Sequence, residues 1–249
     1  MTEPGLIAVG LFLPLFPLSI VFNAVLERIG HPLLRSALLL VWPQIGLLLL
    51  SSLDVQLPSW LVIWGLATAL LYAFRLLAMR EMGRWTGFLA TSAWALLWLP
   101  AFAGVPVPQL WAFAGGFSVP LVFMTLLAHL LQQQYGAAYT GLYGGLALRL
   151  PRFSGVLVIS TLAATATPLF PTFFGMLQAL IVSQPMPAVG LTVTWLIWSW
   201  AGARLLQGLI VGPAEPSPEH DLSLATTWGY ALGLSLLVVA GIILTGSQL

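Results

Sequence analysis

The sequence predicts an all-α polytopic membrane protein, and three observations support this fold class. Of the 249 residues, 59% are hydrophobic and only 6% are charged, and the mean hydropathy is +1.00. A water-soluble domain has about a quarter of its residues charged, so lipid must be the main solvent of this chain. The long apolar stretches are apolar on every face, which favours helices over the alternating pattern of a membrane β-barrel.

Eight segments are apolar enough to be membrane helices, since a helix needs about 20 such residues to cross the hydrocarbon. They are residues 4–26, 36–53, 57–74, 85–104, 107–131, 153–183, 187–210 and 224–246. The connections between them are short, and no linker or change of composition marks a second domain. Residues 1–249 are therefore expected to form a single transmembrane domain with about eight transmembrane helices.

Prolines interrupt two of these segments. Pro14 and Pro17 lie inside the first segment and are expected to kink it. The sixth segment is too long for one straight span and contains Pro168 and Pro171. Because proline removes a backbone hydrogen bond and clashes with the preceding turn, we expect this helix to be broken near its middle.

The arginines predict the orientation, since the chain has no lysine. With eight crossings, every arginine falls on one side of the membrane and the other side has only the acidic Glu3 and Asp54. The positive-inside rule makes the arginine side cytoplasmic and puts both termini outside, in the plasma (inner) membrane of a bacterium. The arginines are Arg28, Arg35, Arg75, Arg80, Arg84, Arg149, Arg152 and Arg204.

A proton path needs ionisable groups near the bilayer centre, and the predicted helix centres contain no Asp, Glu, Lys or Arg. His129 and Arg204 come nearest, and both lie toward helix ends. We interpret His129 as a packing residue and Arg204 as a side chain that reaches the headgroups. Asn23, Gln44 and Gln178 are neutral groups that can hydrogen-bond between helices. The chain alone is predicted not to conduct protons.

Patterns for a cofactor, a metal ion or catalysis do not occur in the sequence. There is no cysteine and the three histidines are far apart. The glycine-rich GLYGGLALRLPR lacks the Walker lysine, so we interpret it as a cytoplasmic connection anchored by Arg149 and Arg152. The acidic Glu215, Glu219 and Asp221 are interpreted as a solvated loop. Neither a cofactor, nor a metal ion, nor a nucleic-acid partner is expected.

Three tryptophans, Trp195, Trp198 and Trp200, cluster inside the seventh segment. They could form a platform for a ligand or a quinone. Helix packing and lipid contact are the favoured interpretation, because aromatic side chains commonly have these roles.

Two stretches resemble the proton-conducting antiporter-like subunits shared by respiratory complex I, Mrp antiporters and related assemblies. ALLYAFRLLAMREMGRWTGFLATSAWALL is similar to a segment in which a Q-R-D-L-K-R-type link precedes a helix reading L-L-A-Y-S-x-x-S. GLYGGLALRLPRFSGVLVISTLAATATPLFPTFFGMLQALI is similar to G-G-L-A-R-R-M-P, a small-residue helix and L-P-G-L-P-G-F-x-G-E. With LIWSWAGARLLQGLIVG, the resemblance covers residues 60–212 and implies the fold of the C-terminal half of these subunits.

The resemblance also shows what this chain has lost. The family lysine of the first motif falls on Gly83, and the acidic or basic residue of the broken helix falls on Met176. The family is about twice this long, and the glutamate–lysine pair of its first half has no counterpart here. Residues that keep the broken helix lie between Thr167 and Gly175. They include Pro168, Pro171 and Phe173.

These departures imply a truncated, degenerate relative that works beside intact partners. We expect a non-catalytic accessory membrane subunit of an ion-gradient-driven complex. It would brace a full-length antiporter-like subunit or anchor a peripheral cytoplasmic subunit. The expected contact residues are Arg80, Arg84, Arg149, Arg152 and Arg204.

Three kinds of assembly contain such subunits, and the resemblance favours one of them. Inorganic-carbon (CO2/bicarbonate) accumulation complexes of the Dab type are preferred over complex I-like and Mrp assemblies, which use full-length members. A stand-alone secondary transporter is the main alternative, with its substrate at the break from Thr167 to Gly175. A lipid-modifying enzyme is a further alternative, although the lack of clustered His, Asp or Glu argues against it.

Overall fold

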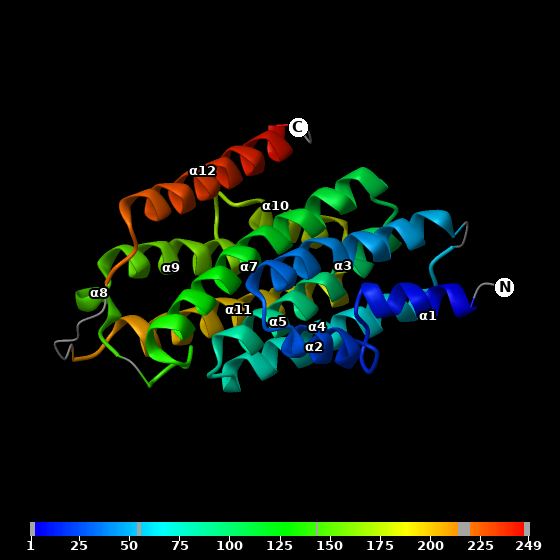
Figure 1. Cartoon of the computed structure of the whole chain (residues 1–249). Coiled ribbons are helices and arrows are strands. Elements are labelled where there is room, and N and C mark those ends of the chain that lie inside the picture. The colour runs from blue at the N-terminus through cyan, green and yellow to red at the C-terminus, as the bar shows by residue number, and fades with distance from the viewer. Residues whose placement is uncertain (1–2, 54–55, 143, 214–219, 247–249) are drawn as a thin grey trace.

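The computed structural model describes residues 3–53, 56–142, 144–213 and 220–246, so Asp54, Glu215 and Glu219 lie outside the described residues. The described part of the chain is an elongated helical bundle with one isolated bridge, between Glu81 and Tyr139 (Figure 1). The helices in chain order are α1 (Glu3–Phe12), α2 (Ser19–Arg28), α3 (Pro32–Ser52), α4 (Trp60–Ala78), α5 (Met82–Ala95), α6 (Trp98–Phe102), α7 (Val107–Tyr135), α8 (Leu146–Arg149), α9 (Pro151–Ala164), α10 (Pro171–Val182), α11 (Pro185–Ile210) and α12 (Leu224–Gly246).

The all-α membrane fold predicted from composition is confirmed. Four helices are long and apolar enough to cross a membrane, namely α3, α4, α7 and α12. Three other predicted segments consist of two consecutive helices each, α1–α2, α5–α6 and α9–α10, while 187–210 corresponds to α11. The number of eight crossings stays a prediction.

The first predicted helix is broken where a kink was expected. Residues 13–18, which contain Pro14 and Pro17, separate α1 from α2. Side chains of the neighbouring helices satisfy the backbone there, as an apolar surrounding requires. The Phe16 N–H donates to Thr68 Oγ1 at 3.0 Å, and the Trp98 indole donates to the Leu13 carbonyl at 3.1 Å.

The arginine-bearing connections meet at one end of the bundle, and the N-terminus lies at the other end (Figure 1). The Thr140 N–H donates to the Arg80 carbonyl at 2.8 Å, which joins the α4–α5 and α7–α8 connections. The Gly141 N–H donates to the Gly208 carbonyl of α11 at 2.9 Å. We call this the arginine end. Its cytoplasmic location remains a prediction.

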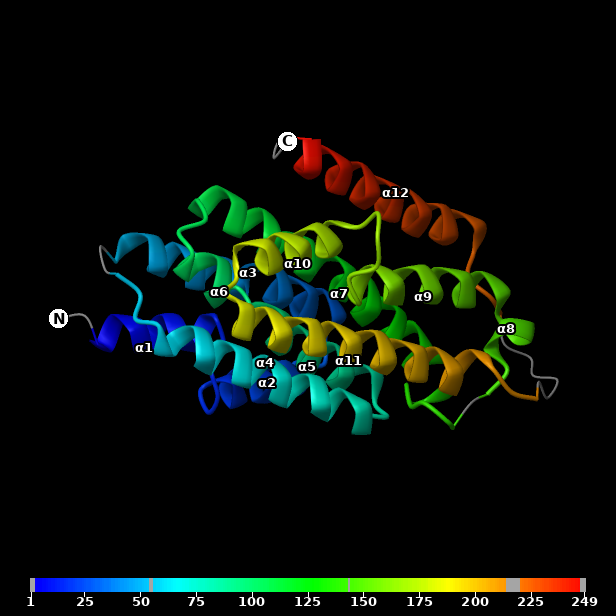
Figure 2. The same ribbon diagram turned by 180° about the vertical axis from the view of Figure 1, so that it is seen from behind.

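Helix packing around α4, α5 and α7 forms the core. Helix α4 packs against α5 and α11, and α7 packs against α3, α5 and α9 (Figure 2). Helix α5 is buried along almost its whole length, including Trp85 and Trp94. The outer helices leave large apolar side chains exposed, as expected for surfaces that face lipid.

Candidate functional site

The break between α9 and α10 confirms the predicted discontinuity. Residues 165–170 are not helical, and Pro171 is the first residue of α10. Ala166 and Leu169 have positive φ angles of 58° and 86°, which are uncommon for residues with a Cβ. Opening a helix in this way leaves backbone carbonyl groups without their helical partners.

Side-chain donors satisfy the carbonyl groups at this break. The Trp195 indole donates to the Ala166 carbonyl at 3.0 Å, from α11. The Thr167 hydroxyl donates to the Leu162 carbonyl at 3.0 Å, and the Thr172 hydroxyl donates to the Ala163 carbonyl at 2.6 Å. These carbonyl oxygens therefore already have hydrogen-bond donors.

Phe173 and Gly175, which were also predicted at the break, have packing roles. The Phe173 ring lies 5.5 Å from the Trp195 ring, measured between centroids. A Cβ at Gly175 would touch Phe113 and Phe117 at 3.5 Å, and Pro168 is exposed. Met176, where the resemblance places an ionisable residue, is 0% exposed and belongs to the apolar core.

Neutral hydrogen bonds join the helices in the bundle interior. Asn23 Nδ2 donates to Thr91 Oγ1 at 2.9 Å, which links α2 to α5 as the sequence predicted for an amide of this kind. The hydroxyl groups of Ser19 and Tyr72 are 2.9 Å apart, and the Trp198 indole donates to Ser92 Oγ at 2.9 Å. All of these groups are buried.

The tryptophans of α11 follow the packing interpretation. Trp198 is fully buried and Trp195 reaches the break, so each has a hydrogen-bond partner inside the bundle. Trp200 is 66% exposed. The three rings therefore point to different surroundings and do not form one platform.

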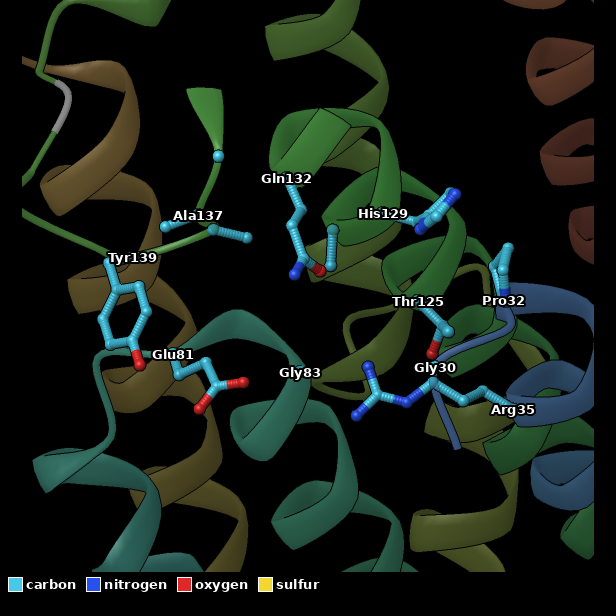
Figure 3. A pocket seen from close by; sticks show the side chains of 13 residues that line it. Gly30, Pro32, Arg35, Glu81, Gly83, Thr125, His129, Gln132, Ala137 and Tyr139 are labelled. Carbon is cyan, nitrogen blue, oxygen red and sulfur yellow. The ribbon is translucent and has the colours of Figure 1, made fainter. Parts of the chain in front are cut away.

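A polar cavity of about 160 Å³ lies at the arginine end, between α3, α5, α7 and the connection after α7 (Figure 3). Glycines and small residues leave room for it, and its polar side chains come from segments far apart in the sequence. These side chains are Arg35, Glu81, Thr125, His129, Gln132 and Tyr139. This cavity is the candidate functional site, because it combines a cation, an acid and an imidazole.

Arg35 and Gly83 define one wall of this cavity. The guanidinium of Arg35 points toward Gly83, and Glu81 lies on the other side (Figure 3). A Cβ at position 83 would lie 3.2 Å from Arg35 Nη1 and 3.6 Å from Glu81 Oε1. Arg35 Nε donates to the Leu26 carbonyl at 3.0 Å, which fixes the side chain. The resemblance implies a lysine at position 83 itself, on α5. In this chain the positive charge beside position 83 comes instead from Arg35 on α3.

Two of the predicted contact arginines have partners within the chain. Arg84 Nε lies 3.2 Å from Glu27 Oε1 and 3.2 Å from Glu81 Oε2. Arg152 Nη1 donates to the Leu222 carbonyl at 3.1 Å. The Nε of Arg149 is buried without a partner among the described residues. These arginines share one end of the bundle, but they do not form one continuous patch of free charge.

The remaining two predicted contact residues, Arg80 and Arg204, lie on a second cavity, which α4 and α11 line. From its position in the sequence, Arg204 is expected near a helix end, with its side chain reaching the headgroups. The structure brings it to the same cavity as Arg80, because α11 packs directly against α4.

Asp221 was expected to be solvated, and this interpretation is wrong. Its carboxylate accepts the backbone N–H groups of Arg152 at 2.8 Å and Phe153 at 3.0 Å, in the first turn of α9. It also accepts the N–H of Leu222 at 2.7 Å. An acidic side chain at a helix N-terminus satisfies donors that lack helical partners. Asp221 therefore ties the segment before α12 to α9.

Comparisons with known proteins identify the fold. No protein-family model and no curated protein matches the chain. A chain of respiratory complex I from Thermus thermophilus with bound NADH superposes with a TM-score of 0.84 at 22% identity, over 94% of this chain and 53% of that one. A chain of the Mrp complex from Dietzia sp. DQ12-45-1b gives 0.77 at 14%, over 98% and 55%. A chain of the membrane-bound sulfane sulfur reductase, an archaeal respiratory membrane complex, gives 0.75 at 18%, over 96% and 51%.

The fold expected from the sequence resemblance is therefore confirmed. Similarity in structure covers nearly the whole chain and is not limited to residues 60–212. The chain spans about half the length of the chains it matches.

Proposed function

We propose that this chain is an accessory membrane subunit of a multisubunit ion-translocating complex, in which it braces a longer antiporter-like chain and does not itself conduct protons. The neutral composition of the bundle interior is the observation that carries this proposal. Buried contacts such as Asn23–Thr91 and Trp198–Ser92 join the helices through neutral groups, whereas a proton relay through the interior needs acids or bases.

The charged groups lie elsewhere. Arg75 is in the last turn of α4 and Glu81 is in the following connection. The polar cavity around Arg35 is at the same end. Protons could enter such a cavity. Beyond it, the apolar core that includes Met176 and the buried hydrogen bonds between neutral groups contain no Asp, Glu, His, Lys or Arg among the described residues for the next step.

The break between α9 and α10 favours the bracing role over a stand-alone transporter. A transporter of the alternative kind would offer unpaired carbonyl groups to an ion or a polar solute. Here Trp195, Thr167 and Thr172 already donate to the carbonyl groups around the break. Among such complexes, we favour an inorganic-carbon complex on the sequence resemblance alone. The surface that we propose contacts the partner is the arginine end.

The test has two parts, made on the full chain. Purification from native membranes in a mild detergent should give co-elution with a longer antiporter-like chain in a fixed ratio. The chain alone, reconstituted in liposomes that contain a pH-sensitive dye, should give no proton flux above empty liposomes, while an added protonophore collapses the gradient in both. Proton flux through the chain alone, or a monodisperse single chain from native membranes that binds a solute, would refute the proposal.

A further inference from the structure

A large amphipathic cavity of about 770 Å³ opens at the arginine end. Its main walls are the end of α4 and the second half of α11, which lie side by side in Figure 2. The apolar part of the wall includes Leu77 and Met79, which are half-buried at the end of α4. Arg80 and Arg204 also line it. The cavity therefore combines an apolar surface with two cations.

The two arginines differ from Arg84, Arg152 and Arg35 at this end. Arg84 pairs with acids and Arg152 and Arg35 donate to carbonyl groups. Within the described ranges, neither Arg80 nor Arg204 has an ion pair or a side-chain hydrogen bond, and no described acidic residue lines the cavity. Two guanidinium groups thus lie on one cavity with their donors unused.

Trp85 also lines this cavity, but it is 1% exposed, and its indole N–H, which has no hydrogen-bond partner in the described structure, has no surface open to the cavity. Gln207 and Thr140 add further polar groups to the lining.

We infer that this cavity binds the phosphate group of an anionic phospholipid. Guanidinium groups match phosphate in charge and in the geometry of paired donors. The half-buried side chains of Leu77 and Met79 on the same cavity offer apolar surface to the glycerol and the first part of the acyl chains, and a free inorganic anion would leave this surface uncovered. Anionic lipids are concentrated in the cytoplasmic leaflet, to which the arginine side is predicted to belong. The inference does not depend on the bracing role.

Lipid binding to the delipidated full chain in a neutral detergent tests the inference. The probes are phosphatidylglycerol, phosphatidylcholine and inorganic phosphate, and the readouts are the thermal unfolding midpoint and lipid retention in native mass spectrometry. Phosphatidylglycerol should raise the midpoint and remain bound, while phosphatidylcholine should bind more weakly. Each of Arg80→Gln and Arg204→Gln should weaken phosphatidylglycerol binding by about tenfold, since a hydrogen bond to a charged group has this effect.

The matched control is Arg28→Gln, an exposed arginine at the end of α2 that does not line the cavity. It should bind phosphatidylglycerol like the unmodified chain. Without lipid, Arg28→Gln, Arg80→Gln and Arg204→Gln should each have the unfolding midpoint of the unmodified chain. Equal phosphatidylglycerol binding by the Arg80→Gln/Arg204→Gln variant and the unmodified chain would overturn the inference. So would a shift that inorganic phosphate reproduces in full, because the source would then be a soluble anion.

Discussion

Arg35 Nη1 lies within 3.2 Å of the position that a Cβ at Gly83 would occupy, so a residue of α3 fills the space beside the first turn of α5. The two residues are far apart in the sequence, and their contact decides which side chains position 83 can accept.

Gly83→Lys should destabilise the protein, because its ammonium group would lie beside the Arg35 guanidinium. Relative to Gly83→Met, which adds similar bulk without charge, we expect a loss of about 1 kcal/mol in the free energy of unfolding. When each change is combined with Arg35→Gln, the difference in stability between the lysine and methionine variants should disappear. Thermal unfolding of the two single and the two double variants measures this coupling as a double-mutant cycle. Equal stability of Gly83→Lys and Gly83→Met would show that the two positions do not interact.

Met176→Glu should unfold or severely destabilise the chain, since the side chain at this position is completely buried in the apolar core. An unpaired buried charge costs about 3–5 kcal/mol, whereas Met176→Leu keeps the volume and should cost less than about 1.5 kcal/mol. The amount of monodisperse protein in detergent and its unfolding midpoint are the measurements. A well-folded Met176→Glu variant would reveal a hydrated path next to α10.

Trp195→Phe should destabilise the break, because the Ala166 carbonyl loses its indole donor while remaining buried. The expected cost is about 1–3 kcal/mol. Trp200→Phe is the matched control on the same helix, and we expect its stability to stay within about 0.5 kcal/mol of the unmodified chain, since this ring is mainly exposed. Hydrogen exchange of residues 165–172 should rise in the first variant alone. Equal exchange in both would mean that the indole does not hold the break.

Asp221→Ala should loosen the start of α9, because two N–H groups of its first turn lose their acceptor. Loss of such a cap costs about 1–2 kcal/mol. Asp221→Asn keeps one carbonyl oxygen and should lose less. Faster amide exchange at Arg152 and Phe153 is the expected local signal, and unchanged exchange there would contradict the assigned role.

Much of the fold could be predicted from the sequence, because lipid imposes simple rules. Apolar length identified the helices, and the pair Pro168 and Pro171 predicted the break that the structure has between α9 and α10. The break between α5 and α6 was not predicted, although Pro100 is a signal for it. Proline has no N–H to donate to the carbonyl of Leu96, four residues earlier, and its ring clashes with that carbonyl, so the helix ends there and shorter i→i−3 hydrogen bonds follow.

The candidate site was harder to predict, because its residues meet only in three dimensions. Arg35, Glu81 and His129 come from three separate parts of the chain, and no spacing in the sequence relates them. Asp221 was missed for the same reason, since the helix that it caps begins at Pro151. The neutral interior was predictable, because the sequence alone shows which segments have no charged residue.

The break between α9 and α10 has a consequence for how such a fold can diverge. Its carbonyl oxygens accept hydrogen bonds from Trp195, Thr167 and Thr172, so the discontinuity persists with no bound ion to hold it open. A backbone discontinuity of this kind therefore needs only neutral side chains of its own chain as hydrogen-bond donors. Under the proposed bracing role, it would preserve the contours that a neighbouring subunit fits while closing one route for leakage across the membrane.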